Sequence, residues 1–307
     1  MDPGDQVSEG QAGGGAAASA TRCGHVALAG RPNVGKSSLL NALVGEHLAI
    51  VSPKAQATRL PVTGLRTDGA VQYIFHDLPG LLDPAYLLQE RMRALALEGV
   101  KRADVILHLH PALEAPAPDF QKVTGLAVLP QAPVLMVYTM SDRLTEAQLV
   151  ALPPAGIPIS VTTGAGLDRL LARVAELLPE AAFEHDPEDL GTQPLRFFVV
   201  EYLREAAFEL LGDELPYAFG AEVDEFREST DPVYIRVTLF VERDSQKGIL
   251  IGEGGRTIRE LGQRARKRLE ALIGRRVYLE TWVKVLPHWR KDAGALTRFG
   301  FPERPGA

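Results

Sequence analysis

The amino-acid sequence predicts a mostly parallel α/β sheet covered by helices, followed by a smaller α+β domain. Three observations indicate this fold. Short apolar runs alternate with helical patterns in the first half, residues 179–194 interrupt the periodicity with Pro, Gly and acids, and the order of elements changes afterwards. Such alternation is typical of parallel sheets, because parallel strands need helical crossovers. At 307 residues, the chain is long enough for two hydrophobic cores.

Five apolar runs in the first half predict buried strands, at residues 25–30, 71–77, 104–110, 133–139 and 157–163. Amphipathic stretches separate most of them and predict helices near 36–44, 86–99, 119–129 and 165–178. The second half begins with a long amphipathic helix at 195–212. Two strands (217–226 and 232–242), a glycine turn, a basic helix (256–274) and a last strand (276–285) follow.

These elements divide the chain into a disordered tail (1–22), a first domain (23–178), a linker (179–194), a second domain (195–292) and a C-terminal tail (293–307). The first segment is rich in Gly, Ala and Ser, and so has little apolar surface to bury. It lacks the basic start and apolar run of a signal peptide. No run approaches ~18 consecutive apolar residues, so we expect no transmembrane segment. The single cysteine, Cys23, excludes an intrachain disulfide and a cysteine-rich zinc site.

Positive charge is concentrated near the C-terminal end. Residues 247–291 hold twelve Lys/Arg and four Glu, a balance of +8, so the remaining residues sum to −14 in a chain of net charge −6. A basic segment in an otherwise acidic protein indicates a polyanion-binding surface. The alternative is a solvated helix face with interspersed charges.

Residues 30–37, GRPNVGKS, match the phosphate-binding pattern G-x-x-x-x-G-K-[ST] between a predicted strand and a predicted helix. The glycines let backbone N–H groups point at phosphate oxygens, and the following helix adds its positive N-terminal end. Lys36 would reach the terminal phosphates and Ser37 would ligate Mg²⁺. We therefore expect a nucleoside triphosphate or diphosphate to contact Gly30, Arg31, Pro32, Asn33, Val34, Gly35, Lys36, Ser37 and Ser38.

Two further segments would complete the phosphate site. Asp77 ends a predicted strand, where an acid can hold Mg²⁺ through water, and Gly80 can give its N–H to a terminal phosphate. Thr58 lies in a loop from which a hydroxyl can close over Mg²⁺, although an ordinary surface threonine is an equal interpretation. The predicted metal ligands are Ser37, Thr58 and Asp77, and the predicted catalytic residues are Lys36, Thr58 and Gly80. The nucleotide contacts in this second segment are Asp77, Leu78, Pro79, Gly80 and Leu81.

The base would be selected by two later strand ends. A carboxylate at Asp142 can accept two hydrogen bonds from the N–H groups of guanine, which adenine does not offer. Backbone groups after the next strand can contact the same base. The residues expected there are Thr139, Met140, Ser141, Asp142, Ser160, Val161 and Thr162.

Residues 252–255 form a G-x-x-G turn between two helical stretches of the second domain. With its α–β–β–α–β order, this domain resembles a KH domain of type II, in which the turn lets a nucleic-acid backbone approach closely. A helix–turn–helix without a ligand is the alternative. The expected RNA contacts are Lys247, Ile251, Gly252, Glu253, Gly254, Gly255, Arg256 and Arg259. The anionic Glu253 is unusual for a phosphate clamp unless its side chain points to solvent.

Three aromatic residues near the C-terminal end could stack on bases: Trp282, His288 and Trp289. For Trp282 we favour core packing or a surface cap. His108 and His110 alternate on one strand face, and two histidines make an incomplete metal site, so we expect structural roles for both.

Longer runs resemble the Era family of GTPases. They are GRPNVGKSSLLNALVG (30–45), IVSPKAQATR (50–59), DLPGL (77–81), PISVTTGAGLDRLL (158–171) and WVKVLPHWRKD (282–292). The resemblance implies a P-loop GTPase domain and a KH domain, GTP/GDP with Mg²⁺, and a K⁺ ion near Asn33, which is equally interpreted as a turn residue. It also implies binding to the 3′ end of small-subunit ribosomal RNA and to the 30S subunit, in ribosome assembly. The expected location is the cytoplasm, with a peripheral contact at the inner face of the cell membrane left open.

The chain departs from that family in its two base-binding motifs, and it shares with that family the absence of a water-orienting glutamine. The usual Asn/Thr-Lys-x-Asp is Thr139-Met140-Ser141-Asp142, and the usual Ser-Ala-Lys is Ser160-Val161-Thr162. Each lost contact would cost ~1 kcal/mol, so we expect weaker guanine binding. Leu81 stands where a water-orienting glutamine occurs in Ras-like enzymes, which predicts slow hydrolysis. The alternatives are a catalytically idle RNA chaperone and a nucleotide-independent KH adaptor.

Overall fold

The computed structural model describes residues 21–212 and 214–303, so most of the predicted tail 1–22 lies outside the described residues. The first domain is a six-stranded sheet in the order β2-β3-β1-β4-β5-β6, in which only β2 runs antiparallel to its neighbour. The strands are β1 Arg22–Ala29, β2 Val62–Asp68, β3 Val71–Asp77, β4 Val105–Pro111, β5 Val134–Thr139 and β6 Ile157–Pro158. The predicted mostly parallel sheet is confirmed.

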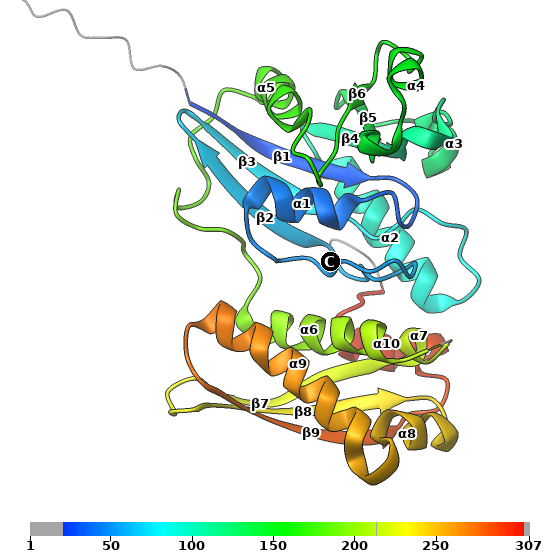
Figure 1. Ribbon diagram of the computed structural model, residues 1–307, viewed down its shortest axis with the longest axis vertical. Coiled ribbons are helices and arrows are strands. Elements are labelled where there is room, and N and C mark those ends of the chain that lie inside the picture. Colours follow the sequence, from blue (N-terminus) through cyan, green and yellow to red (C-terminus); the bar gives the residue numbers. More distant parts are fainter. Residues whose placement is uncertain (1–20, 213, 304–307) are drawn as a thin grey trace, which may run out of the picture.

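Helices cover both faces of this sheet (Figure 1). They are α1 Lys36–Val44, α2 Leu87–Arg102, α3 Phe120–Thr124 and α5 Leu167–Leu177, whereas the short helix α4 Glu146–Val150 buries none of its residues. Side chains of β1 alternate between two cores: Val26 and Leu28 pack with α1 and α5, whereas Ala27 and Ala29 pack with α2 and α3. A parallel strand buried on both faces needs this continuous apolar sequence.

Strand β2 was not predicted. It pairs with β3 in a hairpin whose two-residue turn is Gly69-Ala70, with Asp68 opposite Val71 and Gly69 at φ +57°. The sequence carries a hairpin signal, Asp68-Gly69, just before the apolar run of β3. The strand itself is only partly apolar and contains Gly64, which lowers its β-propensity.

The second domain is a three-stranded sheet, β7-β8-β9, with helices on one face. Its elements are α6 Leu195–Leu210, α7 Leu215–Ala218, β7 Gly220–Arg227, β8 Val233–Val241, α8 Asp244–Ile251, α9 Arg256–Ile273 and β9 Val277–Val285. β7 and β8 are antiparallel, whereas β8 and β9 are parallel. The predicted α–β–β–α–β order is thus present, with the short helices α7 and α8 added.

The segment separated above as a C-terminal tail carries a helix, α10 Ala293–Arg298. Trp289, Leu296 and Phe301 are buried against Leu88 and Met92 of α2. Arg298 and Phe299 of the same segment contact Glu222 and Phe240 of the second domain, so residues 289–301 pack against both domains.

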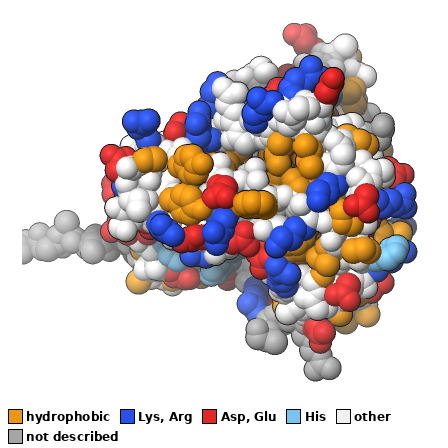
Figure 2. Space-filling model, turned by 90° about the horizontal axis from the view of Figure 1, so that it is seen from below, with side chains coloured by type: hydrophobic (Ala, Val, Ile, Leu, Met, Phe, Trp, Pro, Cys, Tyr) orange, Lys and Arg blue, Asp and Glu red, His pale blue; other side chains and the backbone are white. Residues whose placement is uncertain are grey.

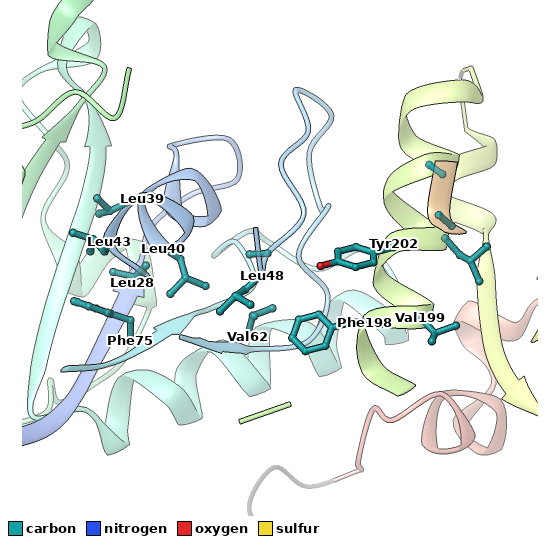
Figure 3. Packing of buried hydrophobic residues seen from close by; sticks show 14 of the residues in the cluster. Leu28, Leu39, Leu40, Leu43, Leu48, Val62, Phe75, Phe198, Val199 and Tyr202 are labelled. Atoms are coloured by element: carbon teal, nitrogen blue, oxygen red, sulfur yellow. The ribbon is translucent and has the colours of Figure 1, made fainter. Parts of the chain in front are cut away.

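The domains also share an apolar contact. Leu48 and Val62 of the first domain face Phe198 and Tyr202 of α6 (Figure 3), and all four belong to one buried cluster. Within the described ranges, no helix has the length and apolar character needed to cross a membrane.

Candidate functional site

The loop between β1 and α1 has the shape that its glycines predict. Gly30 and Gly35 adopt φ of +152° and +92°, in the region that favours glycine. A Cβ on Gly30 would lie 2.5 Å from the carbonyl oxygen of Leu109, so no larger residue fits. Asn33 also has positive φ, and its side-chain amide donates to the carbonyl of Pro53 (2.8 Å). The loop therefore curls in front of the α1 N-terminus and contacts a second loop.

Lys36 is buried inside this curl. Its ammonium donates to the carbonyl oxygens of Arg31 (2.9 Å) and Gly30 (3.3 Å). Burial lowers the pKa of Lys36 to about 8, and the nearby Asp77 opposes that shift. An ammonium held by neutral carbonyls in a desolvated loop is poised to pair with phosphate oxygens.

Three oxygen-bearing side chains from separate parts of the sequence converge beside Lys36. The Ser37 hydroxyl donates to Asp77 Oδ2 (2.7 Å), Thr58 Oγ1 donates to the same oxygen (3.0 Å), and the two hydroxyls are 2.9 Å apart. Thr58 is only 8% exposed, so it is not an ordinary surface threonine. The structure thus brings together the three predicted metal ligands.

The chemistry of this cluster fits Mg²⁺. Asp77 is fully buried, its Oδ1 has no hydrogen-bond partner among the described residues, and burial raises the pKa of its carboxyl. A buried oxygen without a donor loses solvation that a cation would restore. Hard oxygen ligands are those that Mg²⁺ prefers.

A cavity of about 370 Å³ opens beside these groups. The phosphate loop forms one wall and residues 50–58 form another, with Gly80, Met140 and Arg143 at its rim. A Cβ on Gly80 would lie 2.7 Å from the ring of Pro32, so Gly80 brings its backbone against the phosphate loop. Apart from Thr58, the residues of the 50–58 wall were not predicted as contacts, although the run IVSPKAQATR was a signal for them. Arg143 was not predicted either.

Leu81 points away from this cavity. Its side chain is buried in the apolar cluster with Leu78 and Ala96, while its N–H donates to the carbonyl of Gly30 (3.0 Å). It therefore fixes the backbone after Gly80, and its side chain is not available to orient water.

The predicted base-reading residues lie at the ends of β5 and β6. Thr139 donates to the carbonyl of Val34 (2.8 Å), which ties β5 to the phosphate loop. Met140 has φ +57°, and its terminal methyl lies beside Gly35, at 4.0 Å from the position a Cβ would take. The Ser141 N–H donates to the carbonyl of Ile159 (3.0 Å), so the two strand ends are joined. Asp142 is exposed next to them.

The segment that follows β6, residues 160–163, forms a turn. Ser160 is buried, and its hydroxyl accepts the Thr163 N–H (3.2 Å), whereas Val161 and Thr162 are exposed. Their backbone groups are therefore at the surface on the Asp142 side of the fold.

The glycine turn of the second domain joins α8 to α9. Gly252, Gly254 and Gly255 all have positive φ, and a Cβ on Gly252 would lie 2.2 Å from the hydroxyl of Thr257. A Cβ on Gly254 would meet nothing within 4 Å, so this side of the turn is open. Arg259 donates to the carbonyls of Gly255 (3.0 Å) and Gly254 and stabilises the turn.

The other predicted RNA contacts surround this turn. Glu253 is exposed and lines a hollow with Arg256, Arg259 and Glu260, as expected if its side chain points to solvent. Lys247 and Ile251 lie on α8 and are partly buried. A second hollow of about 370 Å³ runs between α9 and the edge strand β9. It is lined by Ile258, Arg259, Gly262, Gln263, Arg266, Tyr278, Leu279 and Thr281.

The remaining aromatic candidates are placed differently from one another. Trp289 is 1% exposed and donates to the carbonyl of Ala218, so its ring is not available to a base. Trp282, for which we expected packing, is 56% exposed. His108 is buried against Phe120, and burial lowers its pKa to about 4. No cluster of three His, Cys, Asp or Glu residues suited to a metal occurs in the described part of the chain.

The loop of residues 46–59, of which residues 50–58 line the nucleotide cavity, also contacts the second domain. Glu205 of α6 accepts the Val51 N–H (3.3 Å) and lies 3.0 Å from His47 Nε2. Lys54 donates to the carbonyls of Phe208 (2.9 Å) and Leu211 (2.5 Å) at the C-terminal end of α6. The same loop therefore contacts the cavity and the second domain.

Together, the curled loop, Lys36 and the oxygen cluster define a P-loop nucleotide-binding domain, joined to a domain with the KH turn. Family models agree: one described as a 50S ribosome-binding GTPase matches residues 25–140, and a KH domain model matches residues 214–290.

Solved structures extend the likeness over both domains. A point variant of Aquifex aeolicus Era bound to GDP·AlF₄⁻ is 34% identical, with a TM-score of 0.87 over 92% of this chain and 100% of that one. Era in complex with MgGDPNP and nucleotides 1506–1542 of 16S ribosomal RNA is also 34% identical, with a TM-score of 0.86 over 92% and 99%. The chain belongs to the Era family of GTPases.

Proposed function

We propose that this protein binds GTP and GDP with Mg²⁺, hydrolyses GTP slowly, and binds single-stranded RNA at the 3′ end of small-subunit ribosomal RNA during assembly of the small subunit. The observation that carries the proposal is the convergence of Ser37, Thr58 and Asp77 beside Lys36, in a molecule that also has an open KH turn. The related structures support it, because one contains MgGDPNP and a segment of 16S ribosomal RNA.

In this proposal, residues 23–178 bind the nucleotide, residues 195–292 bind RNA, and 179–194 link them. The phosphate loop and Lys36 hold the phosphates, and the Gly80 N–H donates to the terminal one. Ser37, Thr58 and Asp77 are the groups that would hold Mg²⁺, which neutralises charge on the β- and γ-phosphate oxygens when bound. The contacts with the nucleotide and with RNA are those assigned above from the sequence.

Slow hydrolysis follows from the position of Leu81, whose buried side chain cannot polarise a water. Backbone groups and cations would position the water in place of a glutamine, and a K⁺ ion near Asn33 would assist. Guanine preference would rest on Asp142, with Met140 covering the base where a lysine is usual.

A nucleotide competition panel tests the first half of the proposal. GTP and GDP should bind more tightly than ATP and xanthosine nucleotides, and GTP turnover should be slow and increase with K⁺. A lack of any guanine preference would contradict it. Lys36→Ala should lose nucleotide but retain RNA, because its contacts are confined to the phosphate loop.

A variant of the glycine turn tests the proposed RNA binding. Replacing Glu253 and Gly254 together by Asp should abolish RNA binding, because two carboxylates would stand where phosphates approach, while nucleotide binding stays intact. Affinity of the wild-type protein should fall steeply with salt, as expected for several phosphate contacts. Unchanged RNA affinity in the double variant would refute the assignment of the turn.

A second candidate is a nucleotide-binding RNA chaperone without turnover. Met140, in place of the usual lysine, favours it by weakening the base site. Measurable GTP hydrolysis that Thr58→Ala abolishes would exclude it. For location we propose the cytoplasm, with the 30S subunit as partner; the described residues offer no feature that favours the alternative of a peripheral membrane contact.

A further inference from the structure

The outer face of the β7-β8-β9 sheet, opposite α6 and α9, is only half covered. The half that contains Phe240 is covered by the C-terminal segment. There the rings of Phe240 and Phe299 are 5.2 Å apart, and Trp289 meets Phe299 edge-on. On the half that this segment does not cover, Tyr278 and Trp282 of β9 are each 56% exposed. Within residues 21–212 and 214–303, no other Phe, Tyr or Trp side chain is exposed. Tyr278 and Trp282 lie on the same face of β9 because they are four residues apart.

The exposed rings are held in place by a shared carboxylate. Tyr234 lies directly opposite Tyr278 on β8, and the two rings stack with centroids 5.9 Å apart. The Tyr234 hydroxyl donates to Glu280 (2.5 Å), and the Trp282 indole N–H donates to the same carboxylate (2.8 Å). The outer-face aromatic platform, Tyr234, Tyr278 and Trp282, is thus oriented before any ligand arrives.

Cations surround this platform. Arg227 lies over the Tyr234 ring at 5.1 Å, Arg236 is within 3.4 Å of Glu225, and Lys284 is exposed on the same face of β9. Three acids lie in the patch, Asp224, Glu225 and Glu280, and each already accepts a hydrogen bond or ion pair from a neighbour. Exposed rings bordered by Arg and Lys are the combination with which proteins hold single-stranded nucleic acid. Figure 2, which views the molecule from this end, shows hydrophobic side chains interspersed with Lys and Arg and also with Asp and Glu.

The platform is continuous with the hollow beside the glycine turn. Tyr278 lines that hollow together with Arg259 and Arg266, and it also stacks on Tyr234 of the platform. A strand that leaves the hollow over the edge of β9 therefore meets Trp282 next. This continuity favours the same RNA chain as the occupant over a separate protein partner.

We propose that the outer-face aromatic platform is a second RNA-binding surface, on which a single-stranded RNA already held at the glycine turn continues around β9 and stacks bases on Tyr278 and Trp282. The inference rests on the proposed RNA binding and extends it to a longer RNA than the turn alone accommodates. KH turns clamp about four nucleotides.

The test compares two oligoribonucleotides from the 3′ end of small-subunit ribosomal RNA, one of about four nucleotides and one of about ten. The longer RNA should bind the wild-type protein more tightly. Trp282→Ala should weaken the longer RNA roughly 5- to 150-fold and leave the shorter one unchanged, since one stacked base is lost. Trp282→Phe keeps a stacking ring without the indole N–H, and should retain most of the affinity.

Fluorescence gives an independent readout. The chain has two tryptophans, and of these only Trp282 is exposed. The longer RNA should quench it, whereas the shorter RNA should not. Nucleotide binding by each variant checks that the fold is intact.

Two outcomes would overturn the inference in different ways. Equal affinity of the longer RNA for wild-type and Trp282→Ala protein, with both RNAs lost in the glycine-turn variant, would leave the proposed function standing and assign the platform to a protein partner. Failure of the wild-type protein to bind either RNA would remove the proposed function and this extension together.

Discussion

At the scale of single residues, Lys36 combines burial, charge and function in one group. Its ammonium has only carbonyl oxygens and the nearby Asp77 to offset its desolvation, so burial lowers its pKa to about 8. Phosphate oxygens in the adjoining cavity would favour the charged form and raise that pKa again. Nucleotide binding is therefore linked to protonation of this residue.

We predict that nucleotide binding takes up a proton above about pH 8, and that affinity falls as pH rises through that window. Affinity falls with rising pH because Lys36 of the nucleotide-free protein loses its proton near pH 8, whereas Lys36 paired with phosphate keeps it. Calorimetry at about pH 9, in buffers of different ionisation enthalpy, should give an uptake approaching one proton.

Lys36→Arg is the matched control, because a guanidinium remains charged throughout this range. It should show no proton uptake, whatever its affinity. Equal proton uptake by both proteins would show that another group titrates.

At the scale of elements, the ends of β5 and β6 form the part of the site that departs from its family. Thr139 still ties β5 to the phosphate loop through Val34, so the frame of the base site is kept. Met140 lies against Gly35 and offers apolar cover without a charge. The segment therefore keeps its backbone frame and differs in having an uncharged side chain at position 140.

We predict that Met140→Lys increases guanine nucleotide affinity by ~1 kcal/mol, about fivefold, by restoring a charged hydrogen-bond donor. ATP affinity should change less, so the ratio of GDP to ADP dissociation constants measures the effect. Met140→Leu keeps apolar cover and should behave like the wild type. A gain of equal size in Met140→Leu would mean that packing, and not charge, limits binding.

At the scale of the whole molecule, Glu205 connects the two proposed sites. It is buried in α6, accepts the Val51 N–H from the cavity wall, and pairs with Arg268 of the basic helix α9 (3.1 Å). Arg59 adds to this contact by donating to the carbonyls of Phe219 and Pro216. A change in the 46–59 loop on nucleotide exchange would thus reach α9 through one carboxylate.

We predict that Glu205→Gln reduces the effect of nucleotide on RNA affinity, because it weakens both the loop contact and the α9 ion pair. Coupling between sites is typically 1–3 kcal/mol, or 5- to 150-fold. The ratio of RNA affinities with GDP and with a non-hydrolysable GTP analogue measures it. The effect of RNA on nucleotide affinity should fall by the same factor, since coupling is reciprocal.

Glu209→Gln provides the control for this prediction. Glu209 pairs with Arg264 and Arg268 of α9 and, in the part of the chain that the structure describes, makes no hydrogen bond or ion pair with the loop, so its loss should leave the coupling largely unchanged. An unaltered coupling ratio in Glu205→Gln would place the connection elsewhere, for example at Arg59.

Local features of the sequence determined the parts of this protein that depend on backbone geometry. The phosphate loop, the glycine turn and the alternation of strands with helices each follow from residues close together in the chain, as Gly30, Gly35 and Gly252 illustrate. Such features are set by steric limits that neighbouring residues already encode.

Tertiary structure decided what depends on packing between distant segments. Only the fold buries Thr58 against Asp77, covers Trp289 while exposing Trp282, and places Glu205 between the 46–59 loop and α9. In each case the partners are far apart in sequence. A side chain's burial is set by which surfaces meet, and residue type and local periodicity do not specify that.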